Sequence, residues 1–318
     1  MNEFALINKY LKSLSQKNAN ALNLSDDIFF DYKKKFGVSI DTYVHGVHFT
    51  SKDPNFFLKK VLRSSLSDLY CKGIKPDCYF LSVSASKNLI SKKWLSKVKK
   101  ILRSEQRKFK IVLSGGDTTI STKLSITIVV LGSSKIKPIL RRNCKLNDDI
   151  YVTGNIGDSF LGLCIIQKKF NFGKLNKFFL KSFYEPDLPF KLQPYLHKIA
   201  NSSIDISDGL LQDLSHICIF RKLGATIDLK KIPLSLSSKY LVNSGKIKVK
   251  NIFSRGDDYQ FLFTSNSNNR KKINNLSKKL NLKITRIGKI TNQKVITFKD
   301  NDKIFDARSI KMGYLHNF

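Results

Sequence analysis

The chain has 318 residues and a formal net charge of +33, because 57 Lys and Arg stand against only 24 Asp and Glu. This length fits one oversized domain or two ordinary ones, and 42% hydrophobic with 25% charged residues is normal for a globular protein. The charge suggests nucleic-acid binding, yet 47 of the basic residues are Lys spread along the whole chain, and Arg forks that read bases are scarce. Solvated Lys is the favoured interpretation, and nucleic acid is not the expected partner.

The cysteines and the apolar runs indicate the cellular compartment of the protein. The five cysteines are widely spaced, form no C-x-x-C pair and are odd in number, which argues against a disulfide framework. No long apolar run follows Glu3, and no stretch of about 18 apolar residues occurs, so we expect neither a signal peptide nor a membrane span. A reducing cytoplasm fits these features.

Hydrophobic spacing and turn residues predict alternating helices and strands. In chain order we expect helices over 3–14, 54–71, 91–107, 158–167, 174–182, 192–200, 208–223 and 270–280. We expect strands over 38–44, 79–84, 110–114, 124–131 and 150–154, then a short strand ending at 205, and strands over 225–228, 257–264, 283–290 and 294–298. The stretch 138–147 reads as a boundary. Both halves mix helices and strands, so the fold class is α/β (α+β) with two mixed domains.

The acidic residues are the most informative feature, because 21 of the 24 are Asp and they gather in short motifs. Asp is the shorter carboxylate and holds its charge close to the backbone. Oxygen ligands of this kind suit Mg²⁺, which usually completes its shell with water and substrate phosphate. The sequence therefore indicates a basic protein with acidic spots that jointly hold metal-bound phosphates.

Taken singly, three of these spots allow more than one interpretation. Asp26-Asp27 is equally consistent with a turn or helix cap and with metal binding, since adjacent carboxylates repel unless a cation is near. Asp41 lies inside an apolar strand, where a carboxylate needs a partner, so function is favoured. Asp68 lies near the apolar face of the helix over 54–71, and a solvated turn of helix is the favoured reading.

Two further spots lie where strands end. Gly115-Gly116-Asp117 directly follows a strand and reads as a turn whose glycine N–H groups cradle phosphate while Asp117 holds a metal; the alternative is an ordinary glycine turn. Asp205-Ile206-Ser207-Asp208 joins a strand to a helix, where Asp208 either caps that helix or shares a metal with a bound phosphate. Arg142 near the boundary either grips phosphate through its fork or is a surface residue.

The familiar phosphate-binding and hydrolytic motifs are absent. The chain has no G-x-x-x-x-G-K-[ST] loop and no set of protein-kinase motifs. Its His and Cys spacing gives no zinc site, and no G-x-S-x-G elbow supports a Ser-His-Asp triad. Any phosphoryl transfer must therefore use metals held by Asp.

Taken together, the motifs occur in the order typical of the thiamine-monophosphate kinase family, which the chain resembles over essentially its whole length. They are Glu3-Phe4 with Leu6-Ile7, Ser25-Asp26-Asp27, Asp41-Thr42, Gly46-Val47-His48-Phe49, Leu66-Ser67-Asp68-Leu69, Gly115-Gly116-Asp117-Thr118-Thr119, Tyr151-Val152-Thr153-Gly154 with Gly157-Asp158, Asp205-Ile206-Ser207-Asp208-Gly209-Leu210, Gly256-Asp257-Asp258-Tyr259 and Gly313-Tyr314.

The resemblance implies an ATP- and Mg²⁺-dependent kinase that phosphorylates thiamine phosphate to thiamine diphosphate. It places the chain in a superfamily with aminoimidazole ribotide synthetase and selenophosphate synthetase. It also implies an N-terminal ATP/Mg-binding and dimerisation domain over 1–138, whose pairing forms a homodimer, and a C-terminal α/β domain over 139–318 that completes the nucleotide and substrate site.

The resemblance also assigns roles to single residues. The Mg²⁺ ligands it implies are Asp27, Asp41, Asp68, Asp117, Asp205 and Asp208, with Ser39 and Ile40 beside them through backbone oxygens. Asp117 and Asp208 are the implied catalytic residues. Gly116, Asp117, Arg142 and Ser207 resemble the ATP contacts, and His48, Asp257 and Tyr314 resemble the thiamine phosphate contacts. Ser25, Ile40, Ser65, Arg255 and Asp257 stand where the family usually has other residues.

The implied reaction is direct in-line transfer. A phosphate oxygen of thiamine phosphate is already anionic near pH 7, so positioning and charge neutralisation matter more than a general base. Two alternatives remain at this stage: another ATP-dependent synthetase of the same superfamily, and a non-catalytic basic protein that binds nucleic acid. Failure to use thiamine phosphate would favour the first, and a steep salt dependence of RNA or DNA binding the second.

Overall fold

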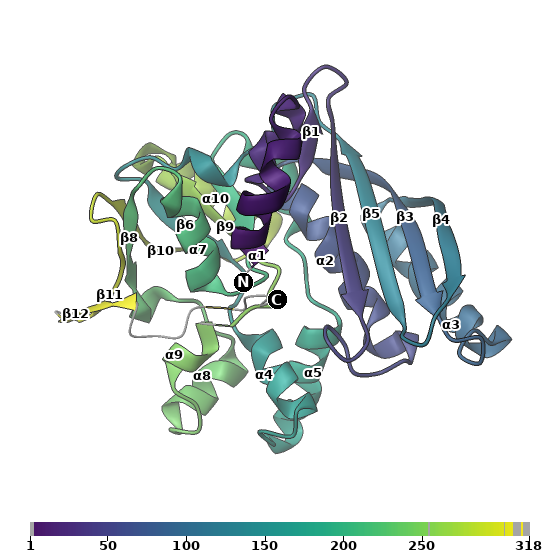
Figure 1. Ribbon diagram of the computed structural model, residues 1–318. Helices are drawn as coiled ribbons and strands as arrows, with labels where there is room; N and C mark the ends of the chain where they lie inside the picture. The colour runs from purple at the N-terminus through teal and green to yellow at the C-terminus, as the bar shows by residue number, and fades with distance from the viewer. Residues whose placement is uncertain (1–2, 254, 302, 308–312, 314–318) are drawn as a thin grey trace.

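A computed structural model describes residues 3–253, 255–301, 303–307 and 313 of the chain. It contains two β-sheets, each with helices packed against it (Figure 1). The first sheet is built from the N-terminal part of the chain and the second from the rest. This mixed architecture confirms the expected α/β (α+β) fold class.

The first sheet has five strands in the order β1-β2-β5-β3-β4. Their bounds are β1 Phe29–Asp31, β2 Phe36–Val44, β3 Lys75–Ala85, β4 Val112–Ile120 and β5 Ser125–Ser133. All neighbours pair antiparallel except β3 and β4, which are parallel. Helices α2, Leu58–Cys71, and α3, Lys92–Phe109, pack on one face of this sheet, and the other face is left open (Figure 1).

The second sheet has seven strands in the order β12-β11-β8-β10-β6-β9-β7. Their bounds are β6 Asp149–Thr153, β7 Ser202–Asp205, β8 Gly224–Asp228, β9 Phe261–Ser265, β10 Ile284–Thr291, β11 Ile296–Asp300 and β12 Lys303–Asp306. The accompanying helices are α4 Asp158–Ile166, α5 Asn176–Tyr184, α6 Gln193–Leu196, α7 Leu210–Ile219, α8 Leu236–Asn243, α9 Val249–Phe253 and α10 Arg270–Leu280. A short helix, α1 Glu3–Leu6, begins the described chain.

Helix α2 joins the two parts of the molecule. Asp53 begins a short 3₁₀ turn over Pro54–Phe56 by accepting the Asn55 N–H, and α2 follows. Nearly all of α2 is buried, including Leu62 and Leu66, because one side packs on the first sheet and another approaches β7 of the second. The larger hydrophobic core accordingly runs from α2 to side chains of the second sheet such as Phe263. The helix thus places residues from both parts of the chain close together.

Most of the expected elements are present, and the differences lie mainly in short ones. Strands β1 and β12 and helices α8 and α9 were not predicted. The helix expected over 192–200 is only Gln193–Leu196. The strand expected over 257–264 begins at Phe261, because Asp257 and Tyr259 have positive φ angles and cannot continue a strand. The expected Asp208 cap is also wrong, since α7 begins after Gly209.

The turn predicted at Gly115-Gly116-Asp117 is wrong, because β4 runs straight through these residues. Instead, the glycines allow β4 to lie very close to β3. A Cβ on Gly116 would lie 1.9 Å from the Leu81 carbonyl oxygen on β3, and one on Gly115 would lie 2.9 Å from the Phe80 ring. The paired glycines therefore allow β4 to add to the edge of the sheet.

The proposed domain boundary between 138 and 139 falls after β5, the last strand of the first sheet, and before β6, the first strand of the second. It stays a proposal, because α2 and the shared core make the two parts closely packed neighbours. Among the described residues, no helix is both long and apolar enough to span a bilayer.

Candidate active site

Six aspartates from distant parts of the sequence meet where the two sheets approach each other. We call them the aspartate cluster: Asp26, Asp27, Asp41, Asp68, Asp205 and Asp208. Asp26 and Asp27 precede β1, Asp41 lies on β2 and Asp68 on α2, while Asp205 ends β7 and Asp208 precedes α7. Proximity is evident from their mutual effects, since the charges of Asp41, Asp205 and Asp27 all raise the pKa of Asp68.

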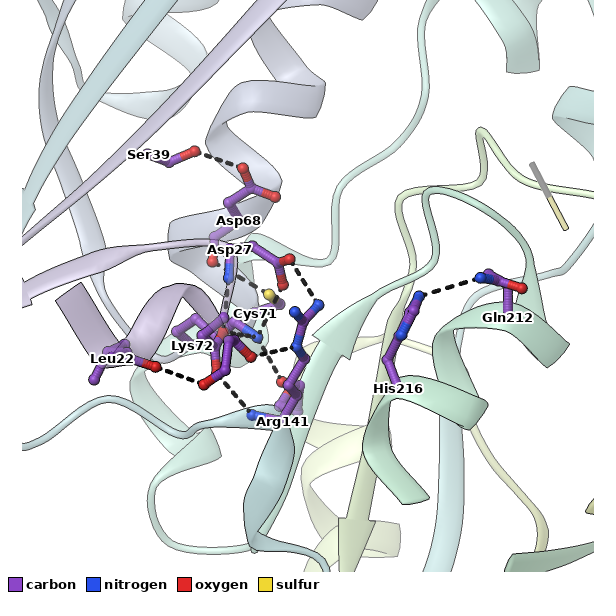
Figure 2. Close-up of polar contacts among 12 residues, drawn as sticks. Leu22, Asp27, Ser39, Asp68, Cys71, Lys72, Arg141, Gln212 and His216 are labelled. Atoms are coloured by element: carbon purple, nitrogen blue, oxygen red, sulfur yellow. Dashed lines mark hydrogen bonds and ion pairs between the residues drawn. The ribbon is translucent and has the colours of Figure 1, made fainter. Parts of the chain in front are cut away.

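Strand β2 and helix α2 build the N-terminal side of the cluster. Ser39, Asp41 and Tyr43 alternate along β2 and face α2. The Ser39 hydroxyl donates to Asp68 Oδ2 at 2.5 Å (Figure 2). Burial raises the pKa of Asp41 even though the nearby hydroxyls of Ser65 and Tyr43 act to lower it. The sequence interpretation of Asp68 as a solvated turn of helix is therefore wrong, since its side chain faces the cluster.

Strand β7 contributes the C-terminal side of the aspartate cluster. Asp205 is 2% exposed, and its Oδ2 atom has no hydrogen-bond partner of normal geometry among the described residues. Burial raises the pKa of Asp205 to about 7, and the nearby charges of Asp27 and Asp41 add to this rise. Burial likewise raises the pKa of Asp208 to about 7, together with the charges of Asp205 and Asp27.

We call Asp41, Asp68, Asp205 and Asp208 the uncompensated end of the cluster. None of these four carboxylates forms an ion pair with a described Lys or Arg. Burial and mutual repulsion raise the pKa of each of them. An orphaned carboxylate oxygen and clustered short carboxylates are the donor set that a hard divalent cation such as Mg²⁺ requires, so the residues fit this ion.

We call Asp26, Asp27, Lys72 and Arg141 the paired end. Lys72 Nζ lies 2.7 Å from Asp26 Oδ1 and 3.4 Å from Asp27 Oδ2. Arg141 Nη1 donates to Asp27 Oδ1 at 2.9 Å, and its backbone N–H donates to Asp26 Oδ2 at 3.0 Å. Although burial acts to raise the pKa of Asp27, Arg141 and Lys72 together hold it at about 2 (Figure 2).

The arginine that reaches the cluster is Arg141, whereas Arg142 was predicted to contact ATP. Both lie in the short 3₁₀ turn Arg141–Asn143. Arg141 is 6% exposed and turns inward, whereas the Arg142 side chain is half-buried and its carbonyl accepts the Arg221 Nε–H at 3.1 Å. The sequence analysis considered only Arg142. The burial of Arg141, which the sequence does not reveal, distinguishes the two arginines. Arg142 remains a predicted nucleotide contact.

The turn before α7 is held by a residue that sequence reasoning missed. Asp213, 1% exposed, accepts the Gly209 N–H at 3.0 Å and so fixes the turn that carries Ser207 and Asp208. Asp213, Asp208 and His216 place ligand atoms within 4.8 Å of one another. Burial, with Arg141, lowers the pKa of His216 to about 4, which keeps the ring neutral near pH 7. The Asp–Leu–x–His spacing after Asp208 was the available sequence signal.

The loop before β9 lies against the same turn. The Asp257 N–H donates to the Ser207 carbonyl at 2.8 Å, and a Cβ on Gly256 would lie 1.7 Å from that oxygen. Asp257 Oδ1 accepts from Lys60 Nζ at 2.8 Å and from the Tyr259 hydroxyl at 3.0 Å. Lys60 comes from α2, so Asp257, which is predicted to contact the substrate, is held by a residue of the other half of the chain.

Of the two other predicted substrate contacts, His48 and Tyr314, only His48 lies among the described residues. His48 is half-buried beside β2, where its Nδ1 accepts the Val44 N–H at 2.9 Å and its ring packs edge-on to Tyr43. Tyr314 lies outside the described residues. The neighbouring Gly313 is described and approaches the turn, since a Cβ there would lie 2.3 Å from the Asp208 carbonyl oxygen.

Within this chain, Asp117 and Ile40 do not join the cluster through their side chains. Asp117 pairs with Ser82, Ser82 with Thr127, and Thr127 with Thr42, so the four form one row across the sheet. Thr42 and Thr127 are in contact at 2.9 Å on the open face, which places Asp117 there too. Three strand spacings separate Asp117 from β2, roughly 14 Å. Ile40 points to the same open face and is 66% exposed.

Comparison with known proteins places this arrangement in a family. The profile described as "AIR synthase related protein, N-terminal domain" matches residues 19–134, and that described as "AIR synthase related protein, C-terminal domain" matches residues 146–301. A thiamine-monophosphate kinase of Buchnera aphidicola from Schizaphis graminum is 37% identical, with 94% of this chain and 97% of the relative covered.

The chain belongs to the thiamine-monophosphate kinase family. The Escherichia coli K12 member is 31% identical over 91% of this chain and 90% of its own length. The Aquifex aeolicus thiamine monophosphate kinase has the same fold, with a TM-score of 0.80 at 24% identity over 95% of this chain and 97% of that one. A ThiL structure complexed with AMPPCP and TMP matches with a TM-score of 0.80 at 23% identity over 96% of both chains.

Proposed function

We propose that this chain is a kinase that transfers the γ-phosphoryl group of ATP to thiamine monophosphate, giving thiamine diphosphate and ADP. Family membership supports the reaction, and one feature of the fold supports the chemistry. Four carboxylates without a cationic partner among the described residues gather where the two halves of the chain meet. A metal-free site of this kind repels phosphate, whereas a metal-loaded one attracts it.

The transfer is a direct displacement. An anionic phosphate oxygen of thiamine monophosphate forms a bond to the γ-phosphorus of ATP, and the bond from that phosphorus to the β–γ bridging oxygen breaks, so ADP leaves. No proton has to be removed from the attacking oxygen near neutral pH. The protein's task is therefore to bring two anions together in line and to balance their charge.

We propose that Mg²⁺ is held by Asp27, Asp41, Asp68, Asp117, Asp205 and Asp208, with the backbone oxygens of Ser39 and Ile40 beside them. Bound Mg²⁺ neutralises phosphate charge and orients the reacting groups. Asp117 and Asp208 act as the catalytic carboxylates. Gly116, Arg142 and Ser207 contact ATP: the Arg142 fork suits phosphate, and Ser207 lies in the turn that Asp213 fixes.

The acceptor site lies beside the turn before α7. Asp257 offers a carboxylate to the cationic thiamine, and Lys60 with Tyr259 holds that carboxylate in place. His48 and Tyr314 are the other proposed contacts, and a Tyr ring face is suited to a cation. A shorter Asp in place of the family's usual Glu is compatible with this role, because the loop packs directly on Ser207.

The open face of the first sheet supports a homodimer. Its outward side chains include Ile40, 66% exposed, Val112, 59% exposed, and Phe80, 37% exposed. A second copy that packs on this face would cover these apolar groups. We propose that Asp117 acts at a site shared with the partner subunit, because within its own chain it lies on the open face, three strands from β2.

Mixing two inactive variants tests this arrangement. In a mixed dimer of Asp117→Asn and Asp68→Asn subunits, one site keeps Asp68 from one subunit and Asp117 from the other. Activity that returns after the two variants are unfolded and refolded together supports a site shared between subunits. Refolded mixtures that stay inactive, beside wild type that recovers, would place Asp117 in its own chain's site.

The reaction itself is tested by separating thiamine diphosphate from a mixture of protein, ATP, thiamine monophosphate and MgCl₂. We expect product only with MgCl₂, with none in EDTA, and an equal amount of ADP. Asp117→Asn, folded and dimeric, should lose most of its turnover. A folded protein that hydrolyses ATP without making thiamine diphosphate would contradict the proposed acceptor.

A cytoplasmic location is also part of the proposal. All five cysteines are free thiols, and four of them are buried. Free thiols of this kind are compatible with a reducing compartment.

A further inference from the structure

Lys72 is a fully buried lysine at the centre of the site. It follows the last residue of α2 and is 0% exposed. Its Nζ lies 2.7 Å from Asp26 Oδ1, 2.9 Å from the Ser203 carbonyl oxygen and 3.4 Å from Asp27 Oδ2. The ammonium thus donates a hydrogen bond to the Ser203 carbonyl and forms ion pairs with both carboxylates.

The surroundings of this ammonium resemble those of a bound metal ion. Its three nearest partners are oxygens, two of them carboxylate oxygens, which is the kind of shell a hard cation selects. Ser203 lies on β7, two residues before the proposed ligand Asp205, and Asp27 is itself a proposed ligand. Figure 2 shows Lys72 among Asp27, Cys71 and Arg141. The ammonium therefore occupies a cation position inside the aspartate cluster.

The charged groups of the aspartate cluster are distributed unevenly around the Lys72 ammonium. At the paired end, two carboxylates face two built-in cations, Lys72 and Arg141, so that end is neutral without any metal. At the uncompensated end, four carboxylates have no such partner among the described residues. A divalent ion bound beside Asp26 and Asp27 would have to displace the Lys72 ammonium, which is tethered to the chain and 0% exposed.

We propose that the Lys72 ammonium takes the place of one divalent ion in the aspartate cluster, so that free metal ions bind only towards the uncompensated end. Asp27 then orients towards those ions with its remaining lone pairs while Lys72 and Arg141 hold it. This inference rests on the proposed function, because it assumes that the cluster binds metal.

Counting bound Mn²⁺ by equilibrium dialysis tests the proposal, with Lys72→Met compared with the wild type. Met keeps most of the side-chain volume and removes the charge. The variant should bind one more Mn²⁺ per chain than wild type. In EDTA its thermal midpoint should fall below that of wild type, and saturating Mn²⁺ should restore most of the difference. Lys72→Arg should keep the wild-type ion count.

Two controls separate a cation substitute from an ordinary buried ion pair. Lys60→Met removes a second buried lysine, which lies on α2 and pairs with Asp257 instead of the cluster, and it should leave the Mn²⁺ count unchanged. Asp26→Asn with Lys72→Met removes a carboxylate together with its cation. This double variant should fold in EDTA and bind no additional ion.

The outcomes distinguish this inference from the proposed function. An unchanged Mn²⁺ count in folded Lys72→Met, with the same loss of stability in EDTA and in Mn²⁺, would overturn the inference. So would a double variant that folds while Lys72→Met stays unfolded even in saturating Mn²⁺. Wild type that binds no Mn²⁺, or makes no thiamine diphosphate, would instead remove the proposed function itself.

Discussion

The two ends of the aspartate cluster solve the same electrostatic problem in different ways. At the paired end, the chain supplies its own cations, and the pKa of Asp27 is about 2 despite burial. At the uncompensated end, buried carboxylates have only each other, and the pKa values of Asp205 and Asp208 rise to about 7. Under the proposed function, the paired carboxylates assemble the site and the uncompensated carboxylates bind the ions that arrive with the substrate.

The largest expected effect comes from removing one carboxylate of the uncompensated end. Asp68→Asn should lower turnover on the order of 100-fold or more, because a group that balances charge in the transition state is lost. The same change should raise stability in EDTA, since it relieves repulsion from Asp41 and Asp205 while Asn still accepts from Ser39. Steady-state kinetics and thermal unfolding in EDTA measure the two effects. A loss of stability in EDTA would contradict the claim that the carboxylates of the uncompensated end repel one another.

The two ends should also give opposite pH dependence to the stability of metal-free protein. The raised pKa values of Asp205 and Asp208 stabilise the fold below their ordinary value of 3.8, and this contribution is lost as the pH rises through about 7. The lowered pKa of Asp27 stabilises the fold above 3.8, and its contribution is lost as the pH falls through about 2.

Denaturant titrations in EDTA at several pH values measure this difference. The free energy of unfolding should decline between pH 4 and pH 7 by about 3 kcal/mol for each carboxyl group whose pKa rises from 3.8 to about 7. Saturating MgCl₂ should remove the decline, because bound ions replace the protons. A decline that persists in MgCl₂ would assign it to groups outside the cluster.

A smaller loss is expected from the paired end. Asp27→Asn should destabilise metal-free protein by about 2 kcal/mol, below the usual cost of breaking a buried ion pair because the Asp27 side chain keeps 31% exposure. Glu105→Gln is a matched comparison, since Glu105 forms a buried two-point ion pair with Arg63 away from the cluster. Chemical denaturation in EDTA would show both losses, and a stabilised Asp27→Asn would contradict the assignment of this end.

The smallest effect is expected outside the aspartate cluster, at Asp257, the carboxylate that is proposed to contact the substrate. Tyr259→Phe removes the hydroxyl that donates to Asp257, a change worth about 1 kcal/mol. The KM for thiamine monophosphate should rise about fivefold with little change in kcat, and the dependence on Mg²⁺ should stay that of wild type. A changed Mg²⁺ requirement would show that this carboxylate belongs to the metal-binding group after all.

The sequence predicted the fold and the family better than the internal geometry of the site. Asp motifs and hydrophobic spacing predicted two mixed domains and the carboxylates that meet between them. Asp41, inside an apolar strand, was predicted to need a partner, and it lies among the other carboxylates of the cluster. Spacing could not show that Asp68 faces inward, because a helix residue near the edge of an apolar face can point either way.

The residues that were missed act through burial, which one sequence does not reveal. Lys72 looked like one of 47 lysines, and only its packing between Asp26 and Ser203 distinguishes it. Arg141 and Arg142 are indistinguishable until the chain turn is known. The strand through Gly115 and Gly116 was missed because paired glycines usually mark turns, whereas here they admit a neighbouring strand.

The most direct test is thermal unfolding of wild type and of Asp68→Asn with Asp205→Asn, above pH 7, in EDTA and in saturating MgCl₂. The account predicts that Mg²⁺ raises the midpoint of the wild type and that the double variant, already stabilised in EDTA, gains little from Mg²⁺. A wild-type midpoint that does not respond to Mg²⁺ would contradict the claim that the uncompensated carboxylates are a metal site.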